Sequence, residues 1–458
     1  MQKRKNDIIT YLETIRMENL AYIAGLSNYT SLEEYSHLVR EENGKKIWTE
    51  ALQQAINEHQ IVMIPSSEDV YYLDGSVRIP SNRHIEAAPD AVIRLTAETK
   101  VLMLRNENTL DGTHAPFSDE HRNVNVSING GRWEESNTGR LGYGSTGKYD
   151  EERSYYGVST CMLFNNIENL TLTNMTFVCT AGFSVQMGNA KNVVIENIRF
   201  ESCFADGIHV NGNTENLLIR NLFGEVGDDL VALNTYDWQN SSVNFGPGKV
   251  IFCENLHSAP GSGYKCMRLE PGMYIFDDGS QVDCSLTDVV IRNMSGVLTY
   301  KMYYQTPCYT LGTDPERGDA GSMANIYFED IDIDLTGPCD AFPEYLQSDP
   351  VRGWFGAFEM GSNIKSISFE NIRLTTYPEK YPLSRMIVVG PKSIRGTDAE
   401  VFDPYISNTV ELIELKDIFV NGEKVLDADK LIRVTSFDDV NGDGKSSGKG
   451  TLCKVNLI

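Results

Sequence analysis

Apolar and polar residues alternate along this chain in a six-residue pattern that recurs eight times: apolar, any residue, apolar, any residue, Asn or Asp, apolar. The instances end at Met175, Ile198, Leu222, Leu256, Met294, Ile331, Ile372 and Ile418. The fixed polar position holds Asn174, Asn197, Asn221, Asn255, Asn293, Asp330, Asn371 and Asp417. Successive polar positions are 23, 24, 34, 38, 37, 41 and 46 residues apart, which indicates one repeated unit with inserts of different length.

This alternation predicts strands that bury one face. The shortest steps match one coil of a solenoid, and the longer steps place inserted loops at the turns. One coil cannot bury its apolar face alone, whereas stacked coils share a continuous core. An Asn at a fixed turn position can hydrogen-bond to the coils on both sides and satisfy backbone groups of a tight turn. The pattern therefore predicts an all-β fold, a single-stranded right-handed parallel β-helix; a leucine-rich repeat or a β-sandwich would show other signatures.

The flanking segments suggest three parts. Residues 62–95 contain short strands divided by Pro, Gly, Ser and Asn, as expected of the first coils. Apolar residues at helical spacing precede them: Ile8, Leu12, Ile15, Leu52, Ala55 and Ile56. We expect residues 1–60 to form a mainly helical cap over the N-terminal end, because an open end would expose strand edges and core. Residues 61–425 form the β-helix in this interpretation, and residues 426–458 a polar tail that adds little to the core.

The net charge of −24 comes from 64 acidic and 40 basic residues. It argues against nucleic acids and anionic membranes as partners. Neither a secretory signal nor a run of 18 apolar residues is visible. The nine cysteines contain no C-x-x-C pair, and several lie within apolar strand patterns. This usage favours buried free thiols over disulfides or a zinc site, and we expect a cytoplasmic location.

A second strand follows the ladder Asn in each coil, and these strands should align on one face. Their outward positions bring Gln186, His209, Arg268, Glu270 and Tyr303 together. Asp206 precedes one strand, and Asp228 and Asp229 precede the next, 22–23 residues or one coil later. Stacked carboxylates repel one another, which raises the pKa of at least one of them. Such a group can serve as general acid while another stays ionised as base, although aspartates of this kind also occur simply as turn residues.

The β-helix, the D-G at 206–207 and the G-D-D at 227–229 resemble glycoside hydrolase family 28, the polygalacturonases, over roughly residues 60–420. The resemblance implies that Asp228 is the general acid that protonates the leaving oxygen. It implies that Asp206 and Asp229 hold and deprotonate the attacking water, so that the anomeric configuration inverts. For inversion we expect Asp206 and Asp228 to splay from one strand spacing, about 4.8 Å, to about 6.5–9.5 Å.

Two other motifs of the family are replaced here. In place of its G-H-G the nearest residues are Leu256, His257 and Ser258. In place of its R-I-K, which grips a uronate carboxylate, stand Arg268, Leu269 and Glu270, with Lys265 just upstream. Lys265 and Arg268 could bind an anionic sugar, or Glu270 could neutralise Arg268, in which case the substrate could be a neutral sugar. The complete set of predicted substrate-binding residues is His209, Gln186, Lys265, Arg268, Glu270, Tyr303, His257 and Trp238.

The sequence thus favours an inverting, exo-acting hydrolase of oligosaccharides, including uronic-acid-containing or pectin-derived sugars, with no cofactor and no metal ion. Self-association into a homo-oligomer stays open. Asp439–Gly444 resembles half a calcium loop, but Gly450 stands where such a loop has Glu, so we expect a turn there. One alternative is a β-helix lyase or an intramolecular fructotransferase, which the three acids fit less well. Another is a non-catalytic carbohydrate-binding solenoid, which would need no stacked acids.

Overall fold

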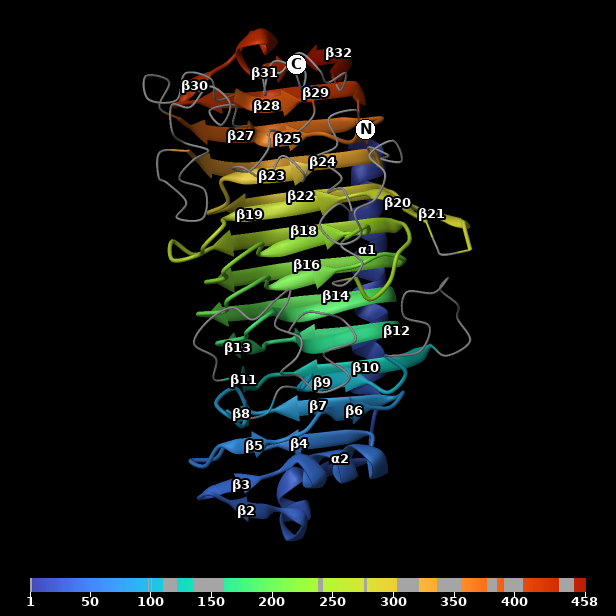
Figure 1. The fold of residues 1–458 in the computed structure, drawn as a ribbon, viewed down its shortest axis with the longest axis vertical. Helices are drawn as coiled ribbons and strands as arrows, with labels where there is room; N and C mark the ends of the chain where they lie inside the picture. Colours follow the sequence, from blue (N-terminus) through green and yellow to red (C-terminus); the bar gives the residue numbers. More distant parts are fainter. Residues whose placement is uncertain are drawn as a thin grey trace.

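The described strands stack into one long right-handed parallel β-helix, which confirms the predicted fold class (Figure 1). The computed structural model describes residues 2–97, 99, 101–109, 122–135, 160–237, 242–275, 278–302, 321–335, 356–376, 385–390, 407–435 and 449–458. Trp238, Tyr303 and the calcium-like stretch 439–444 lie outside these residues.

Three strand stacks form the faces of the solenoid. The longest contains β1 (Tyr29–Ser31), β4 (Ile61–Ile64), β7 (Arg83–Ala87), β10 (Asn123–Asn129), β12 (Thr160–Thr173), β14 (Phe183–Glu201), β16 (Thr214–Gly224), β18 (Gly248–Ser258), β22 (Leu286–Ser295), β24 (Ser322–Asp334), β27 (Ile367–Thr375), β29 (Asn408–Val420) and β32 (Gly450–Leu457). We call it the ladder face.

The second stack, which we call the site face, contains β6 (Val77–Ile79), β9 (Leu104–Asn106), the first parts of β12 and β14, β15 (Ile208–Val210), β17 (Val231–Asn234), β19 (Cys266–Glu270), β23 (Thr299–Met302), β25 (Gly356–Met360), β28 (Arg385–Val389) and β31 (Ile432–Val434). The third contains β3 (Lys45–Ile47), β5 (Tyr71–Leu73), β8 (Val92–Leu95), β11 (Arg132–Glu134), β13 (Thr176–Val178) and the end of β14. Short additions are β2 (Arg40–Glu42), β20 (Gly272–Ile275), β21 (Gln281–Cys284), β26 (Asn363–Ile364) and β30 (Glu423–Lys424).

The core runs along the axis because inward positions of successive coils stand in register. One such column contains Ile195, Ile219, Cys253, Ile291, Phe328, Phe369 and Leu415, all buried. Stacking every coil in this way removes the apolar face of each strand from water, which is the main contribution to stability. Cys203, Cys253 and Cys284 are buried as free thiols.

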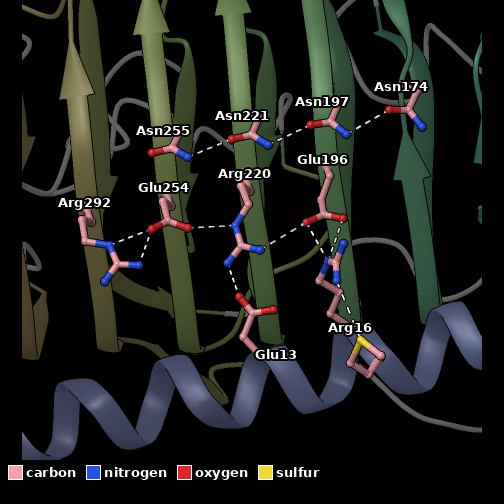
Figure 2. Close-up of polar contacts among 11 residues, drawn as sticks. Glu13, Arg16, Asn174, Glu196, Asn197, Arg220, Asn221, Glu254, Asn255 and Arg292 are labelled. Atoms are coloured by element: carbon pink, nitrogen blue, oxygen red, sulfur yellow. Dashed lines mark hydrogen bonds and ion pairs between the residues drawn. The ribbon is translucent and has the colours of Figure 1, made fainter.

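The predicted Asn ladder is present at the end of the ladder-face repeats. Asn197, Asn221 and Asn255 donate from Nδ2 to the Oδ1 of the preceding ladder Asn, at 2.9, 2.8 and 2.9 Å (Figure 2). The eight ladder residues have φ between 53° and 58°, the left-handed region that Asn and Asp tolerate better than other side chains. The same side chain therefore permits the turn and links the coils.

We expected residues 1–60 to cover the N-terminal end of the solenoid. Helix α1 (Gln2–Ala24) instead runs along the outside of the ladder face (Figure 1). Ile8 and Leu12 pack on an outward apolar column, Val194, Leu218, Phe252, Val290 and Tyr327. The end of the solenoid is instead covered by η1 (Leu32–Leu38) and α2 (Thr49–Glu58), whose apolar residues join the main core. None of the described helices is long and apolar enough to span a membrane.

Charged residues beside this apolar column hold α1 in place (Figure 2). Glu196, Arg220, Glu254 and Arg292 alternate in sign on neighbouring strands, with Arg220 Nε 2.8 Å from Glu254 Oε2. From the helix, Arg16 Nε donates to Glu196 Oε1 at 2.8 Å, and Glu13 pairs with Arg220. Near its start, Lys5 Nζ lies 3.1 Å from carboxylate oxygens of both Glu329 and Glu370.

The C-terminal tail also differs from the expectation that it would add little to the core. β31 pairs with β28, and β32 pairs with β29, so residues after 425 build part of a further coil. Leu431, beside η5 (Ala428–Lys430), is buried in the main core, and Leu452, Val455 and Leu457 pack against it. Apolar residues of the tail therefore close the C-terminal end of the solenoid.

Candidate active site

The three predicted aspartates meet at the start of two neighbouring site-face strands. Asp206 precedes β15, and Asp228 and Asp229 precede β17. One carboxylate oxygen from each residue lies within 4.8 Å of the other two. The expected separation of about 6.5–9.5 Å between the Asp206 and Asp228 carboxyl groups as a whole stays a prediction. The turns that carry the three carboxylates are packed closely.

Two glycines explain this close packing. A Cβ added to Gly207 would lie 2.7 Å from the carbonyl oxygen of Leu230. A Cβ added to Gly227 would lie 2.2 Å from the carbonyl oxygen of Phe204. Only glycine permits the two turns to approach so closely, and each glycine adjoins a member of the acid cluster. The D-G and G-D-D sequences thus place three carboxylates on adjacent coils.

The three carboxylates differ in exposure. Asp206 is 3% exposed and Asp229 2% exposed, whereas Asp228 is only partly buried. Asp206 accepts a hydrogen bond from the backbone N–H of Asp229 at 3.2 Å. The Oδ1 atom of Asp229 is buried without a hydrogen-bond partner among the described residues. Asp228 is therefore the member that can meet a substrate, and Asp229 offers a free acceptor behind it.

His209 lies between two carboxylates. Its Nδ1 is 2.6 Å from Asp206 Oδ2 and its Nε2 is 2.8 Å from Asp237 Oδ2. Phe183 stacks on the ring at a centroid distance of 3.9 Å. Burial lowers the pKa of His209, but the hydrogen bonds to Asp206 and Asp237 outweigh burial and raise this pKa to about 9. At neutral pH an imidazolium thus favours the ionised form of Asp206.

For Asp229, by contrast, the surroundings favour the protonated form. Burial raises the pKa of its carboxyl group from 3.8 to about 7, Arg268 opposes this rise, and the negative charges of Asp228 and Asp206 add to it. Arg268 Nε lies 3.4 Å from Asp229 Oδ2, and its Nη1 lies 3.6 Å from Glu270 Oε2. Near neutral pH Asp229 can therefore hold a proton, which its position beside Asp228 allows the two carboxyl groups to share.

The remaining predicted site residues are spread over several places. Gln186 is fully buried, accepts from Thr160 Oγ1 and donates to Asn211 Oδ1, both at 2.8 Å. Lys265 lines a cavity of about 440 Å³ together with Asp332, Asp334 and Arg373, one coil from the acids. His257 lies in β18, bonded to Ser295 Oγ at 2.7 Å and stacked on Phe223. Trp238 and Tyr303 cannot be placed, since they lie outside the described residues.

Three functional candidates escaped the sequence reasoning. Asp237 is 2% exposed and reaches His209 from the loop after β17, and no repeat marked this position. Lys301 stands directly beside Arg268 in register, and Glu359 directly beside Lys301; both are buried. The sequence did contain a signal for Lys301. It is two residues before Tyr303 on a strand whose alternate residues face outward, so the alternation predicts it on the same face as that site residue.

The acid cluster also has the oxygen donors that a cation would need. Two cations of the chain also lie beside it: His209 touches Asp206, and Arg268 lies beside Asp229. The described site thus supplies its own positive charge to the carboxylates.

Solved structures with the same fold include carbohydrate-active proteins. The family 28 exopolygalacturonase of Yersinia enterocolitica shares 13% identity at a TM-score of 0.53, over 86% of this chain and 71% of its own. A double mutant of the tailspike protein of E. coli bacteriophage HK620, in complex with a pentasaccharide, shares 11% identity at a TM-score of 0.53, over 94% of this chain and 65% of its own. No protein-family model matches, and no curated protein matches significantly in sequence. At these identities the comparisons show a right-handed parallel β-helix.

Proposed function

We propose that this protein is a glycoside hydrolase that cleaves an oligosaccharide with inversion, using Asp206, Asp228 and Asp229. The observation that carries the proposal is the cluster itself: three carboxylates within 4.8 Å, one of them partly exposed, with a pKa of about 7 at Asp229. Buried like charges destabilise a protein, so a cluster of them indicates a function that uses them. The exopolygalacturonase and the pentasaccharide-bound tailspike of the same fold support a carbohydrate substrate.

Asp228 serves as the general acid in this proposal. It is the member of the cluster that is not fully buried, and the pair that it forms with Asp229 retains a proton near pH 7. Its proton passes to the glycosidic oxygen as the bond from that oxygen to the anomeric carbon breaks. A positioned general acid of this kind typically contributes about 10²–10⁴-fold to the rate.

Asp206 and Asp229 hold the attacking water. Two oxygens that both accept hydrogen bonds from one water lie roughly 4–5 Å apart, which the cluster spacing permits. Asp206, kept ionised by His209, takes the proton of the water as its oxygen bonds to the anomeric carbon. His209 is a positioning residue in this scheme, because its buried ring contacts Asp206 and Asp237. Exo-action on short oligosaccharides is part of the same proposal.

The test is hydrolysis by Asp228→Asn. We expect turnover of oligosaccharides, followed as released reducing sugar, to fall by about 10³-fold. The melting temperature should stay near or above that of the wild type, because the crowding of three neighbouring acidic groups is relieved. Asp429→Asn, an exposed aspartate in η5, is the matched control and should keep full activity.

Two results would contradict the proposal. Full activity of Asp228→Asn would remove this residue from the mechanism. An unsaturated product that absorbs in the ultraviolet would show elimination, and binding without turnover by the wild type would show a non-catalytic solenoid.

A further inference from the structure

We infer that the sugar at the cleavage site is neutral, because every cation described there is already matched by carboxylates of the protein. This inference rests on the proposed function and adds the class of substrate to it. A uronic acid would bring a carboxylate next to the aspartate cluster. Its binding would require a cation that is free to pair with it.

Arg268 lies beside Asp229, and protein carboxylates flank it. Asp229 lies 3.4 Å from its Nε and Glu270 lies 3.6 Å from its Nη1. The Glu270 side chain is fully buried, and Arg268 contributes to the compensation of its charge. If a substrate carboxylate took Arg268, Glu270 would lose that contribution in the interior. That cost opposes the binding of an acidic sugar.

The other two cations are also committed. Lys301 is 3% exposed, so its ammonium group lies below the surface that a substrate would touch. Glu359 stands beside Lys301 in register. The positive charge of Lys301 also acts on Asp229 and lowers the pKa of that carboxyl group. The imidazolium of His209 is held between Asp206 and Asp237. Lys265 belongs to the neighbouring cavity. The lining of that cavity contains two cations, Lys265 and Arg373, and two carboxylates, Asp332 and Asp334.

The charge balance points the same way. The described site contains six carboxyl groups, Asp206, Asp228, Asp229, Asp237, Glu270 and Glu359, against the three cations His209, Arg268 and Lys301. With one proton on the Asp228–Asp229 pair, the sum is −2. A low-dielectric, negatively charged site repels an anionic sugar at short range and accepts a neutral one.

The experiment compares oligogalacturonides with the same oligosaccharides after reduction of their carboxyl groups. It also compares p-nitrophenyl galacturonide with p-nitrophenyl galactoside, and p-nitrophenyl glucuronide with p-nitrophenyl glucoside. Within each pair the two members differ only in the carboxylate of each sugar residue and otherwise match. We expect kcat/KM to be at least about 100-fold higher for the neutral member of the pair that is cleaved. In Glu270→Gln, which frees Arg268, the neutral-to-acidic ratio should fall by about tenfold or more.

Binding provides a second measurement that does not depend on turnover. Titration calorimetry of Asp228→Asn at low salt should show tighter binding of the carboxyl-reduced oligosaccharides, and added salt should narrow the difference. A preference of the wild type for galacturonides, in rate or in binding, would overturn the inference and leave the hydrolase proposal intact. If no member of the panel is hydrolysed by the wild type, the hydrolase proposal fails, and the calorimetric preference still decides the charge of the ligand.

Discussion

Single residues determine the chemistry of this site through their burial. Asp206, Asp228 and Asp229 are the same residue type, yet one is paired with an imidazolium, one is partly exposed, and one is buried beside a guanidinium. The sequence predicted their proximity from the one-coil spacing. It could not predict Asp237 as the second partner of His209, because a loop after the strand carries that residue and no repeat marks its position.

The pKa of Asp229 predicts a dependence of stability on pH. Its folded value of about 7 exceeds the ordinary 3.8, so the native state retains a proton that the unfolded chain loses. The corresponding stability is complete below pH 3.8 and is lost as the pH rises through 7. In Asp229→Asn the side chain is always neutral. The difference in unfolding free energy, variant minus wild type, should therefore rise between pH 4 and pH 8 by at most about 4 kcal/mol.

Calorimetric melting at several pH values checks this. The loss of the Arg268 pair in the variant adds a pH-independent offset, so the slope is the result that counts. His209, with a pKa of about 9, titrates equally in both proteins over this range and cancels. A difference that stays flat from pH 4 to pH 8 would show that Asp229 is ionised throughout.

His209→Gln tests the positioning role of the imidazolium. Without its positive charge, Asp206 ionises less readily, so the acidic limb of the kcat/KM profile should move to higher pH and kcat should fall by about 10²-fold or more. The variant should also lose about 3–5 kcal/mol of stability, since Asp206 and Asp237 stay buried without their shared cation.

The double variant His209→Gln/Asp237→Asn separates the two effects. It removes one buried charge of each sign, so stability should largely return. The shifted acidic limb should persist, because Asp206 still lacks its imidazolium. A double variant that recovers both stability and the wild-type pH profile would reduce His209 to a structural residue.

At the scale of elements, the ladder-face repeat carries more information than its strand pattern. The second position of the repeat was written as any residue. In five repeats it holds Val194, Leu218, Phe252, Val290 and Tyr327, against which α1 packs. The fourth position alternates in charge from Glu196 to Arg292 and supplies the ion pairs of Figure 2. The helix was predicted from its own spacing. Its place was missed because an apolar outward column was not sought on strands assumed to face water.

Lys5 links α1 to the far end of that ladder, where Glu329 and Glu370 stand side by side in register. Lys5→Met should destabilise the protein by about 2 kcal/mol, because two neighbouring carboxylates lose the buried ammonium between them. Glu329→Gln added to this variant should restore much of the loss. Urea unfolding measures all three proteins, with the exposed Lys3→Met as matched control.

Equal midpoints for Lys5→Met and Lys3→Met would show that the ammonium group contributes nothing beyond a surface charge. In that case the hydrophobic contacts of Ile8 and Leu12 would hold the helix by themselves.

At the scale of the whole molecule, the fold followed from the sequence because one repeat recurs over most of the chain and every coil obeys the same rule. The two ends could not be predicted in this way. Each end closes the core only once, with α2 and η1 at one end and Leu431 with β32 at the other, so no repetition reveals them. The relation between the acids was predicted only as a spacing, and the turn glycines determined the actual approach.

That approach bears directly on the stereochemistry of the reaction. Carboxyl groups about 5–5.5 Å apart are typical of retaining glycosidases and groups about 6.5–9.5 Å apart of inverting ones, and single oxygens within 4.8 Å of one another are compatible with both. A retaining enzyme, however, needs a carboxylate that can bond to the anomeric carbon. Asp206 and Asp229 are 3% and 2% exposed, so neither carboxylate is accessible enough to bond to the anomeric carbon of a sugar. We therefore expect a water to attack, and inversion to follow.

Proton NMR during the first turnovers checks this expectation. The first free sugar should have the anomeric configuration opposite to that of the cleaved bond, before mutarotation mixes the forms. Hydrolysis in ¹⁸O-labelled water should place one labelled oxygen on the anomeric carbon. Label uptake alone does not decide, because a covalent intermediate is also released by water. Retention of configuration would mean that Asp228, the least buried member, is the nucleophile, and that a proton reaches the leaving oxygen from another group.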